Sequence, residues 1–290
     1  MDTKTTLGYL AVFGSAFFFY LATVVIKWSA MAGLSIESSM FTLSRFVFGF
    51  ITVVVVMGIR RQKIRIVKKR YLVGRAVGNA VAVFCFFRGV ELTSVAQANI
   101  LNMTYPLFIA LFSWIFFKAQ RDVIAVFIVL VAFAGVWLIL SPTNMSFNTD
   151  SLWALASGVS AAAAIMYLNI SRQYHDTQTT LFVMFSLGGA IVFCLFFDEM
   201  RIPDFQEFKY LFWCSAIAIG GQYLLTVGFK YVTAIEGGII SSTRILLAAI
   251  LGPFIAMDPA LPFAGWIGAG LIFLGNVFLT ARKARHVSGN

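Results

Sequence analysis

The segment "ELTSVAQANILNMT" (residues 91–104) decides the fold, because the chain contains a second version of it. A shift of 140 residues lays it on "YVTAIEGGIISSTR" (231–244), with Thr93 on Thr233. Both versions run from a turn of small and polar residues into a long apolar stretch. The chain therefore looks like a duplication.

A second pair of segments supports this interpretation. The segment "GSAFFFYLATVVIK" (14–27) resembles "GVSAAAAIMYLNIS" (158–171) in the same manner. Small and apolar residues align easily, so either match alone is weak. Together they predict two halves, residues 1–146 and 147–290.

The composition indicates an integral membrane protein. Of the 290 residues 60% are hydrophobic and 12% are charged, whereas a soluble domain is about 25% charged. The three cysteines, Cys85, Cys194 and Cys214, lie in apolar segments without a CxxC motif or a nearby histidine. A disulfide framework and a metal site are therefore not expected.

The apolar stretches predict an all-α protein with ten transmembrane helices, since about 20 apolar residues cross a bilayer. The connections between these stretches are too short to hold a soluble domain. The ten predicted spans are residues 7–29, 36–59, 71–91, 95–117, 122–141, 151–170, 178–197, 208–231, 236–257 and 262–281.

The basic residues predict the orientation. Loops alternate between the two sides of the membrane, and one side collects 16 of the 22 Lys and Arg, seven of them within residues 60–70. The positive-inside rule then predicts an inner-membrane protein with both termini in the cytoplasm. The net charge of +10 indicates a face set against anionic lipid, and no nucleic-acid partner is expected.

Five spans per half is an odd number, so the second half enters the membrane from the opposite side. This arrangement is an inverted repeat, whose two halves can exchange conformations and so expose a site between them to each side in turn. The duplication thus predicts two inverted five-helix repeats around a central cavity.

In these features the chain resembles the drug/metabolite transporter superfamily, EamA type. The resemblance covers nearly the whole chain and is carried by the ten spans, the short loops and the segments 92–111 and 232–253, with Pro106 and Pro253 inside or at the end of them. It implies transport of small metabolites, often export. One departure is that the alignment of the halves places Arg244 opposite a threonine.

Two arginines lie inside predicted spans. Arg45 is about nine residues, or roughly 14 Å, from the outer end of its span, and Arg244 lies at a similar depth from the cytoplasmic end. All twelve acidic residues lie at span ends or in loops, so no carboxylate is expected at that depth. The functional interpretation is that the arginines bind an anionic group of a substrate; the structural one is that they bond backbone carbonyls and pack helices.

Four polar residues join the predicted substrate site. Asn99 and Asn102 share a face of the fourth span, Ser241 lies three residues before Arg244, and Tyr20 lies in the first span. Ordinary hydrogen bonding between helices is the alternative for each. Glu91 and Glu236, beside the repeated segments, are predicted as fallback proton carriers.

The expected function is secondary transport by alternating access, as an exporter or exchanger of a carboxylate-bearing, amino-acid-like or other anionic solute. An exporter of lipophilic compounds, favoured by the 31 Phe, and a non-transporting accessory subunit remain alternatives. An enzyme is not expected, because His175 and His286 lie in loop or tail segments and the spans hold no paired carboxylates. No cofactor is expected, no P-loop provides an ATPase motor, and the oligomeric state stays open.

Overall fold

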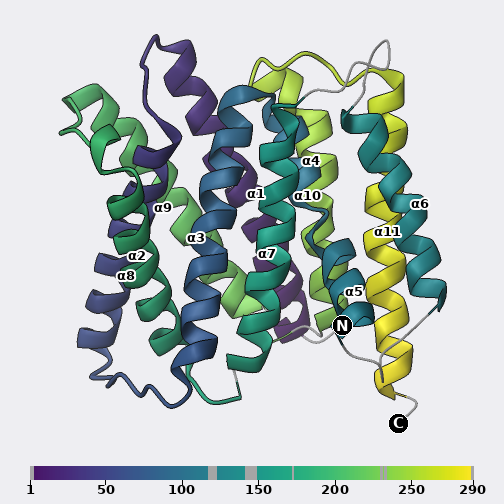
Figure 1. Ribbon diagram of the computed structural model, residues 1–290, viewed down its shortest axis with the longest axis horizontal. Coiled ribbons are helices and arrows are strands. Elements are labelled where there is room, and N and C mark those ends of the chain that lie inside the picture. Colours follow the sequence, from purple (N-terminus) through teal and green to yellow (C-terminus); the bar gives the residue numbers. More distant parts are fainter. Residues whose placement is uncertain are drawn as a thin grey trace.

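The computed structural model describes residues 3–116, 123–140, 149–171, 173–228, 231 and 234–288, and within them the chain is helical with no strand (Figure 1). The all-helical fold is therefore confirmed. The helices are α1 (Thr3–Met31), α2 (Ser38–Ile59), α3 (Lys69–Leu92), α4 (Val95–Asn102), α5 (Tyr105–Phe116), α6 (Val123–Leu140), α7 (Ser151–Ser171), α8 (Thr177–Leu195), η2 (Phe197–Glu199), α9 (Phe205–Gly228), α10 (Ala234–Ile255) and α11 (Phe263–Ser288).

Most of these helices are apolar enough to lie in a membrane. Six stretches of the described residues have the length and composition to cross one, and three shorter apolar helices accompany them. In lipid every backbone N–H and C=O must bond within the protein, which long apolar helices achieve. The protein is thus a multi-pass membrane protein.

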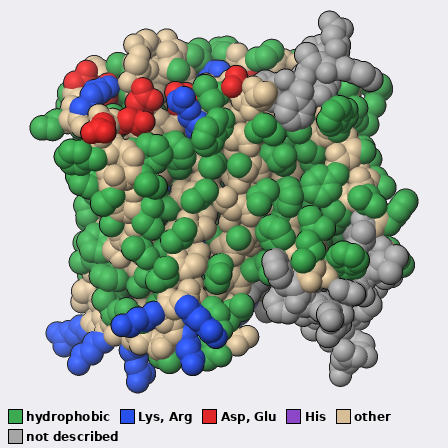
Figure 2. All heavy atoms as spheres, viewed as in Figure 1, with side chains coloured by type: hydrophobic (Ala, Val, Ile, Leu, Met, Phe, Trp, Pro, Cys, Tyr) green, Lys and Arg blue, Asp and Glu red, His purple; other side chains and the backbone are tan. Residues whose placement is uncertain are grey.

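Charged side chains gather at the two ends of the bundle. Lys and Arg side chains line the lower edge in Figure 2, where α2 ends and α3 begins, and we call this end the basic face. Asp and Glu gather with a few basic residues at the upper edge, the acidic face. α1 begins and α11 ends on the basic side (Figure 1).

The fourth predicted span consists of two helices, and residues Val95–Phe112 within it have the length and composition to cross a membrane. The segment breaks at Met103 and Thr104, between α4 and α5. Pro106 has no N–H, so the carbonyl four residues earlier loses its helical partner. Other groups bond the backbone at the break: the Thr104 hydroxyl donates to the Leu101 carbonyl at 2.6 Å, and the Asn276 amide donates to the Met103 carbonyl at 2.8 Å.

Two helix pairs cross through reciprocal contacts. Where α2 meets α8, a side chain added at Gly49 would collide with the ring of Phe185, and one added at Gly188 would collide with the ring of Phe46. These two rings also contact each other edge to face at 6.1 Å. Each helix therefore presents a phenylalanine to a glycine of the other.

The pair α6 and α11 repeats this pattern. A side chain on Gly135 would collide with the backbone of Gly268 and crowd Ile272. One on Gly275 would collide with Ala132 and approach Ile128. Gly268, Ile272 and Gly275 of α11 lie 140 positions after Ile128, Ala132 and Gly135 of α6. The two helices therefore make the same contacts with the residues exchanged.

An ion pair on the acidic face joins the loop before α9 to the first turn of that helix. The Arg201 guanidinium donates to both carboxylate oxygens of Glu207, one at 2.5 Å, and to the Ser35 carbonyl at 3.2 Å. Glu207 also accepts from the Asp204 amide at 3.0 Å, which closes the first turn of α9. The hydrogen bonds from Arg201 hold the pKa of the Glu207 carboxyl below its ordinary value.

This ion pair predicts a pH-dependent stability. A depressed pKa in the folded state means that Glu207 stabilises the fold above the ordinary Glu pKa of about 4.3, and that this contribution disappears as the pH falls through the depressed value. Glu207→Gln should therefore lower the melting temperature at pH 7 and have little effect at strongly acidic pH. The exposed Glu199→Gln is the control. An equal loss for Glu207→Gln at both pH values would contradict this role.

Candidate functional site

Arg45 lies about two turns into α2, with its guanidinium among aromatic rings. The side chain is partly buried, and its Cζ lies 5.8 Å from the centroid of the Phe19 ring and 5.9 Å from that of Phe87. Aromatic faces attract a cation without neutralising it. Among the described residues Arg45 has neither a hydrogen-bond partner nor a carboxylate, so its donors remain available to a ligand.

Arg244 has a different environment. It lies at the middle of α10 and is only 6% exposed, and its Nη2 donates to Oδ1 of Asn102. Its Cζ lies 5.3 Å from the Phe86 ring, and its buried Nε has no partner. Asn102 is the last residue of α4, where the negative end of the helix dipole favours a cation.

Arg45 and Arg244 lie against neighbouring aromatic rings, and we call the two residues the arginine pair. Arg45 lies against the ring of Phe87 and Arg244 against that of Phe86, and the centroids of these two rings are 6.0 Å apart. Two like charges in a medium of low dielectric constant repel each other. An anion bound between or beside them would relieve this repulsion and accept planar, paired hydrogen bonds.

The two asparagines of α4 face different helices. Asn102 donates to the Ser157 hydroxyl of α7 at 2.8 Å while its oxygen accepts from Arg244. Asn99 donates to the Thr23 hydroxyl of α1 at 2.9 Å, and its own buried oxygen has no partner. Asn102 therefore joins the arginine pair, and Asn99 lies one turn closer to the acidic face.

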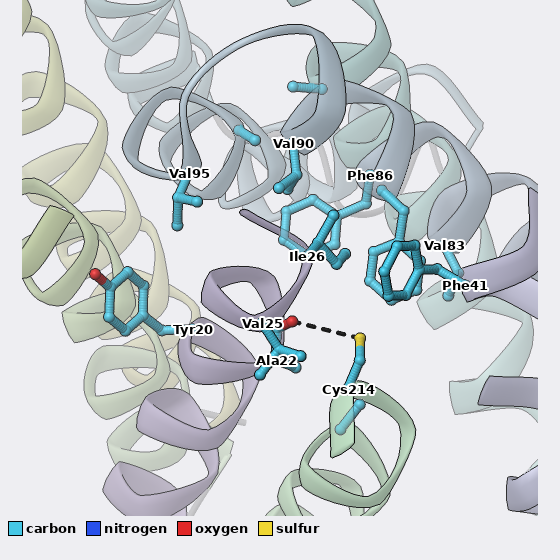
Figure 3. Close-up of a cluster of buried hydrophobic side chains, with 14 of the residues drawn as sticks. Tyr20, Ala22, Val25, Ile26, Phe41, Val83, Phe86, Val90, Val95 and Cys214 are labelled. Atoms are coloured by element: carbon cyan, nitrogen blue, oxygen red, sulfur yellow. Dashed lines mark hydrogen bonds between the residues drawn. The ribbon is translucent and has the colours of Figure 1, made fainter. Parts of the chain in front are cut away.

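Tyr20 and Ser241 are the two remaining residues of the predicted substrate site. Tyr20 is fully buried on α1 and its hydroxyl has no partner. Tyr20 belongs to the same buried cluster as Phe41 and Phe86, and Figure 3 shows it across the α1 ribbon from them. The Ala22 carbonyl of α1 accepts the Cys214 thiol at 3.4 Å. Ser241 is partly exposed, on the helical face of Arg244.

The two predicted proton carriers lie outside this group. Glu91 is exposed at the acidic-face end of α3, where it accepts from Ser38 and pairs with Arg88 at 2.8 Å. The side chain of Glu236 lies outside the described residues. The acid that sequence reasoning overlooked is Asp258, which looks like an ordinary loop residue but is buried. No spacing or motif marks it, because its burial depends on contacts with helices far away in the sequence.

A bundle of long apolar helices with charged side chains at its two ends places the chain in the class of multi-pass membrane proteins. The sequence model of the EamA-like transporter family matches residues 6–141 and 149–281. The chain therefore belongs to the EamA-like transporter family, of the drug/metabolite transporter type. This membership indicates a transporter rather than an enzyme.

Several curated proteins are similar to the chain. An uncharacterized transporter of Helicobacter pylori (strain J99) is 25% identical over 218 residues, 71% of each chain. The pseudopaline exporter CntI of Pseudomonas aeruginosa (strain PAO1) is 25% identical over 165 residues, 56% of this chain and 58% of the exporter. Mouse solute carrier family 35 member G1 is 24% identical over 200 residues, 63% of this chain and 54% of the carrier.

The fold also has a counterpart among solved structures. A crystal structure with 19% sequence identity superposes with a TM-score of 0.62 and covers 98% of both chains. At this identity the match bears on the fold alone. It extends the likeness to the whole length of the bundle, both halves included.

Proposed function

We propose that the protein is an inner-membrane secondary transporter that exports or exchanges a small carboxylate-bearing solute by alternating access. The arginine pair is the observation that carries this proposal. Placing an arginine at the bilayer centre costs about 3 kcal/mol on insertion scales, and within the described residues no carboxylate offsets that cost. A bound anion would do so.

The geometry favours a carboxylate over a neutral solute. Arg45 keeps a free planar fork of N–H donors, which fits the two oxygens of a carboxylate. Arg244, held by Asn102, adds a second positive charge nearby. Phe19 and Phe87 offer apolar surface to the rest of the solute. The name of the relative from Pseudomonas aeruginosa, an exporter, favours outward transport.

We propose further that the chain is built of two inverted five-helix repeats, approximately residues 1–146 and 147–290. The reciprocal glycine contacts between α2 and α8 and between α6 and α11 support it, because a two-fold axis makes each contact occur twice with its members exchanged. The other helix pairs agree: α3 packs on α7 as α9 packs on α1, and α2 packs on α9 as α8 packs on α3. The two stretches matched by the family fall in separate halves.

A topology experiment tests the inversion. Residues 60–68 and 196–204 connect the second and third helices of the two halves. Reporters inserted after Gln62 and after Met200 should therefore lie on opposite sides of the membrane, with the first in the cytoplasm because its loop is strongly basic. Reporters on the same side would rule out inverted repeats.

Alternating access predicts exchange without an energy source. Purified protein in liposomes loaded with unlabelled amino acids and small organic acids should take up the labelled forms faster than empty liposomes do, with no ATP present. Each outward passage of an unlabelled solute returns the site to the outside, so the trans-stimulation reports the cycle directly. Uptake that requires ATP, or the absence of uptake for every carboxylate tested, would contradict the proposed function.

A further inference from the structure

The turn between α10 and α11 buries a carboxylate. Asp258 is 4% exposed as a residue, and its side chain is fully covered. Among the acidic residues that the structure describes, only one other side chain is buried, that of Glu207. Glu207 is held in its charged form by Arg201. Asp258 has no comparable partner.

Backbone groups of α4 and two side chains of α1 surround the Asp258 carboxylate. Its Oδ2 accepts from the backbone amide of Ala96 at 3.2 Å, in the first turn of α4. Its Oδ1 has no hydrogen-bond partner and lies 3.6 Å from the Lys27 ammonium, beyond a good hydrogen bond. Tyr20 is a second titratable group that interacts with it. Burial raises the pKa of the Asp258 carboxyl, although the backbones of Ala96 and Val95 and the charge of Lys27 oppose that change.

The contact connects the two predicted repeats. Asp258 follows α10 in the second half, whereas α4 and α1 belong to the first. The Trp28 indole donates to the Ile255 carbonyl at 2.8 Å, which fixes the same turn to the end of α1. α4 is only eight residues long and ends at Asn102, which holds Arg244. One short helix therefore links Asp258 to the arginine pair.

A row of polar side chains leads inward from Asp258 along α1. Lys27, Thr23 and Tyr20 share one helical face, and Tyr20 lies about 10 Å deeper than Lys27. Thr23 accepts from Asn99 of α4 at 2.9 Å. The oxygens of Tyr20 and Asn99 are buried without partners. Buried polar atoms without protein partners are sites for internal water, which can pass protons.

We propose that Asp258 is the proton-binding carboxylate that couples solute export to proton entry, an inference that rests on the proposed transport function. A proton from the acidic-face side binds Oδ1, and the same proton leaves to the cytoplasmic side past the polar groups of Thr23, Asn99 and Tyr20, while Lys27 sets the pKa of the carboxyl without carrying the proton. Protonation removes the attraction of the carboxylate to Lys27 and to the positive end of α4. The turn then releases α4, and with it Asn102 and Arg244 at the site.

The test compares proton-driven transport with exchange. The liposomes contain the labelled carboxylates of the exchange assay. If one proton moves per solute, a gradient of one pH unit should let the wild type build a concentration ratio of the solute across the membrane of about tenfold. Asp258→Asn keeps an oxygen for the Ala96 amide but cannot titrate. It should lose the response to the gradient and keep exchange. Asp198→Asn, at an exposed aspartate of the acidic face, should behave as wild type.

The outcomes separate this inference from the proposed function. If the wild type exchanges carboxylates but ignores the gradient, or if Asp258→Asn still responds to it, the inference is wrong and the transport function stands. If the wild type does not exchange at all, the proposed function itself is wrong.

A second variant keeps the inference testable if Asp258→Asn does not fold. Lys27→Met removes the cation that opposes protonation, so the pKa of Asp258 should rise and the pH at half-maximal transport should move up by about one unit. Lys209→Met, on the same face, should leave that pH unchanged. An unchanged midpoint in a folded Lys27→Met protein would overturn the inference.

Discussion

Replacing Arg45 with methionine should abolish transport of carboxylate solutes while the protein remains folded. The variant removes a partly buried charge that has no hydrogen-bond partner among the described residues, so folding should lose little. The solute loses a charge-assisted pair of hydrogen bonds, about 3 kcal/mol or roughly a hundredfold in affinity. Arg45→Lys keeps the charge without the planar fork and should fall between the two.

Two measurements on the same samples decide between function and structure for Arg45. The melting temperature is measured in detergent and exchange is measured in liposomes. Arg45→Met should lose exchange while its melting temperature stays at the wild-type value. Arg88→Met, which removes an arginine from α3 near the acidic face, is the matched control and should retain exchange. If Arg45→Met melts at a lower temperature and loses activity only in proportion, the arginine is structural and the proposed site is wrong.

Replacing Arg244 with methionine should lower both stability and transport. Its loss leaves the buried Asn102 oxygen without a donor beside the break of the fourth segment, and an unsatisfied group of this kind costs about 1 to 3 kcal/mol. Because Arg244 and Asn102 act on each other, the double variant Arg244→Met/Asn102→Ala should melt little below the worse single variant.

Fully additive losses would contradict this coupling. A melting temperature for Arg244→Met equal to that of the wild type would also contradict it. Arg244 would then, like Arg45, contribute little to the stability of the fold. The contrast between the two arginines is therefore measurable in a single series of five proteins: the wild type, Arg45→Met, Arg244→Met, Asn102→Ala and the double variant.

The sequence alone was sufficient for the helical membrane fold. Long apolar stretches leave no other way to satisfy the backbone in lipid, so helices such as α1 and α8 follow from hydropathy. The family also followed from sequence, through the two related segments and the short loops. These features are local or repeated along the chain, which makes them visible without coordinates.

The broken fourth segment was not predicted. Pro106 was noticed as a family feature, but a proline inside an apolar segment does not always break the helix, as Pro253 inside α10 shows. The break depends on polar groups from elsewhere, among them Asn276, which bonds the freed backbone. Such partners are 170 or more residues away in the sequence (Met103 and Asn276), and hydropathy does not reveal them.

The site was only partly accessible from sequence for the same reason. Depth in a span singled out both arginines, but only the fold shows that Asn102 holds one of them and that Phe19 and Phe87 flank the other. Asp258 was counted among the loop acids. A loop residue is buried by tertiary packing, here by α1 and α4, and nothing in its own neighbourhood in the sequence records that.

The central claim is that Arg45 holds the carboxylate of the solute, and paired ligands test it most directly. The melting temperature of purified wild type and of Arg45→Met is measured with a carboxylate that is active in exchange and with its neutral carboxamide. At a concentration about 100 times the dissociation constant, the carboxylate should stabilise the wild type by about 2.7 kcal/mol, whereas the carboxamide should have little effect and Arg45→Met should respond to neither. Equal stabilisation of both proteins by the carboxylate would contradict the account.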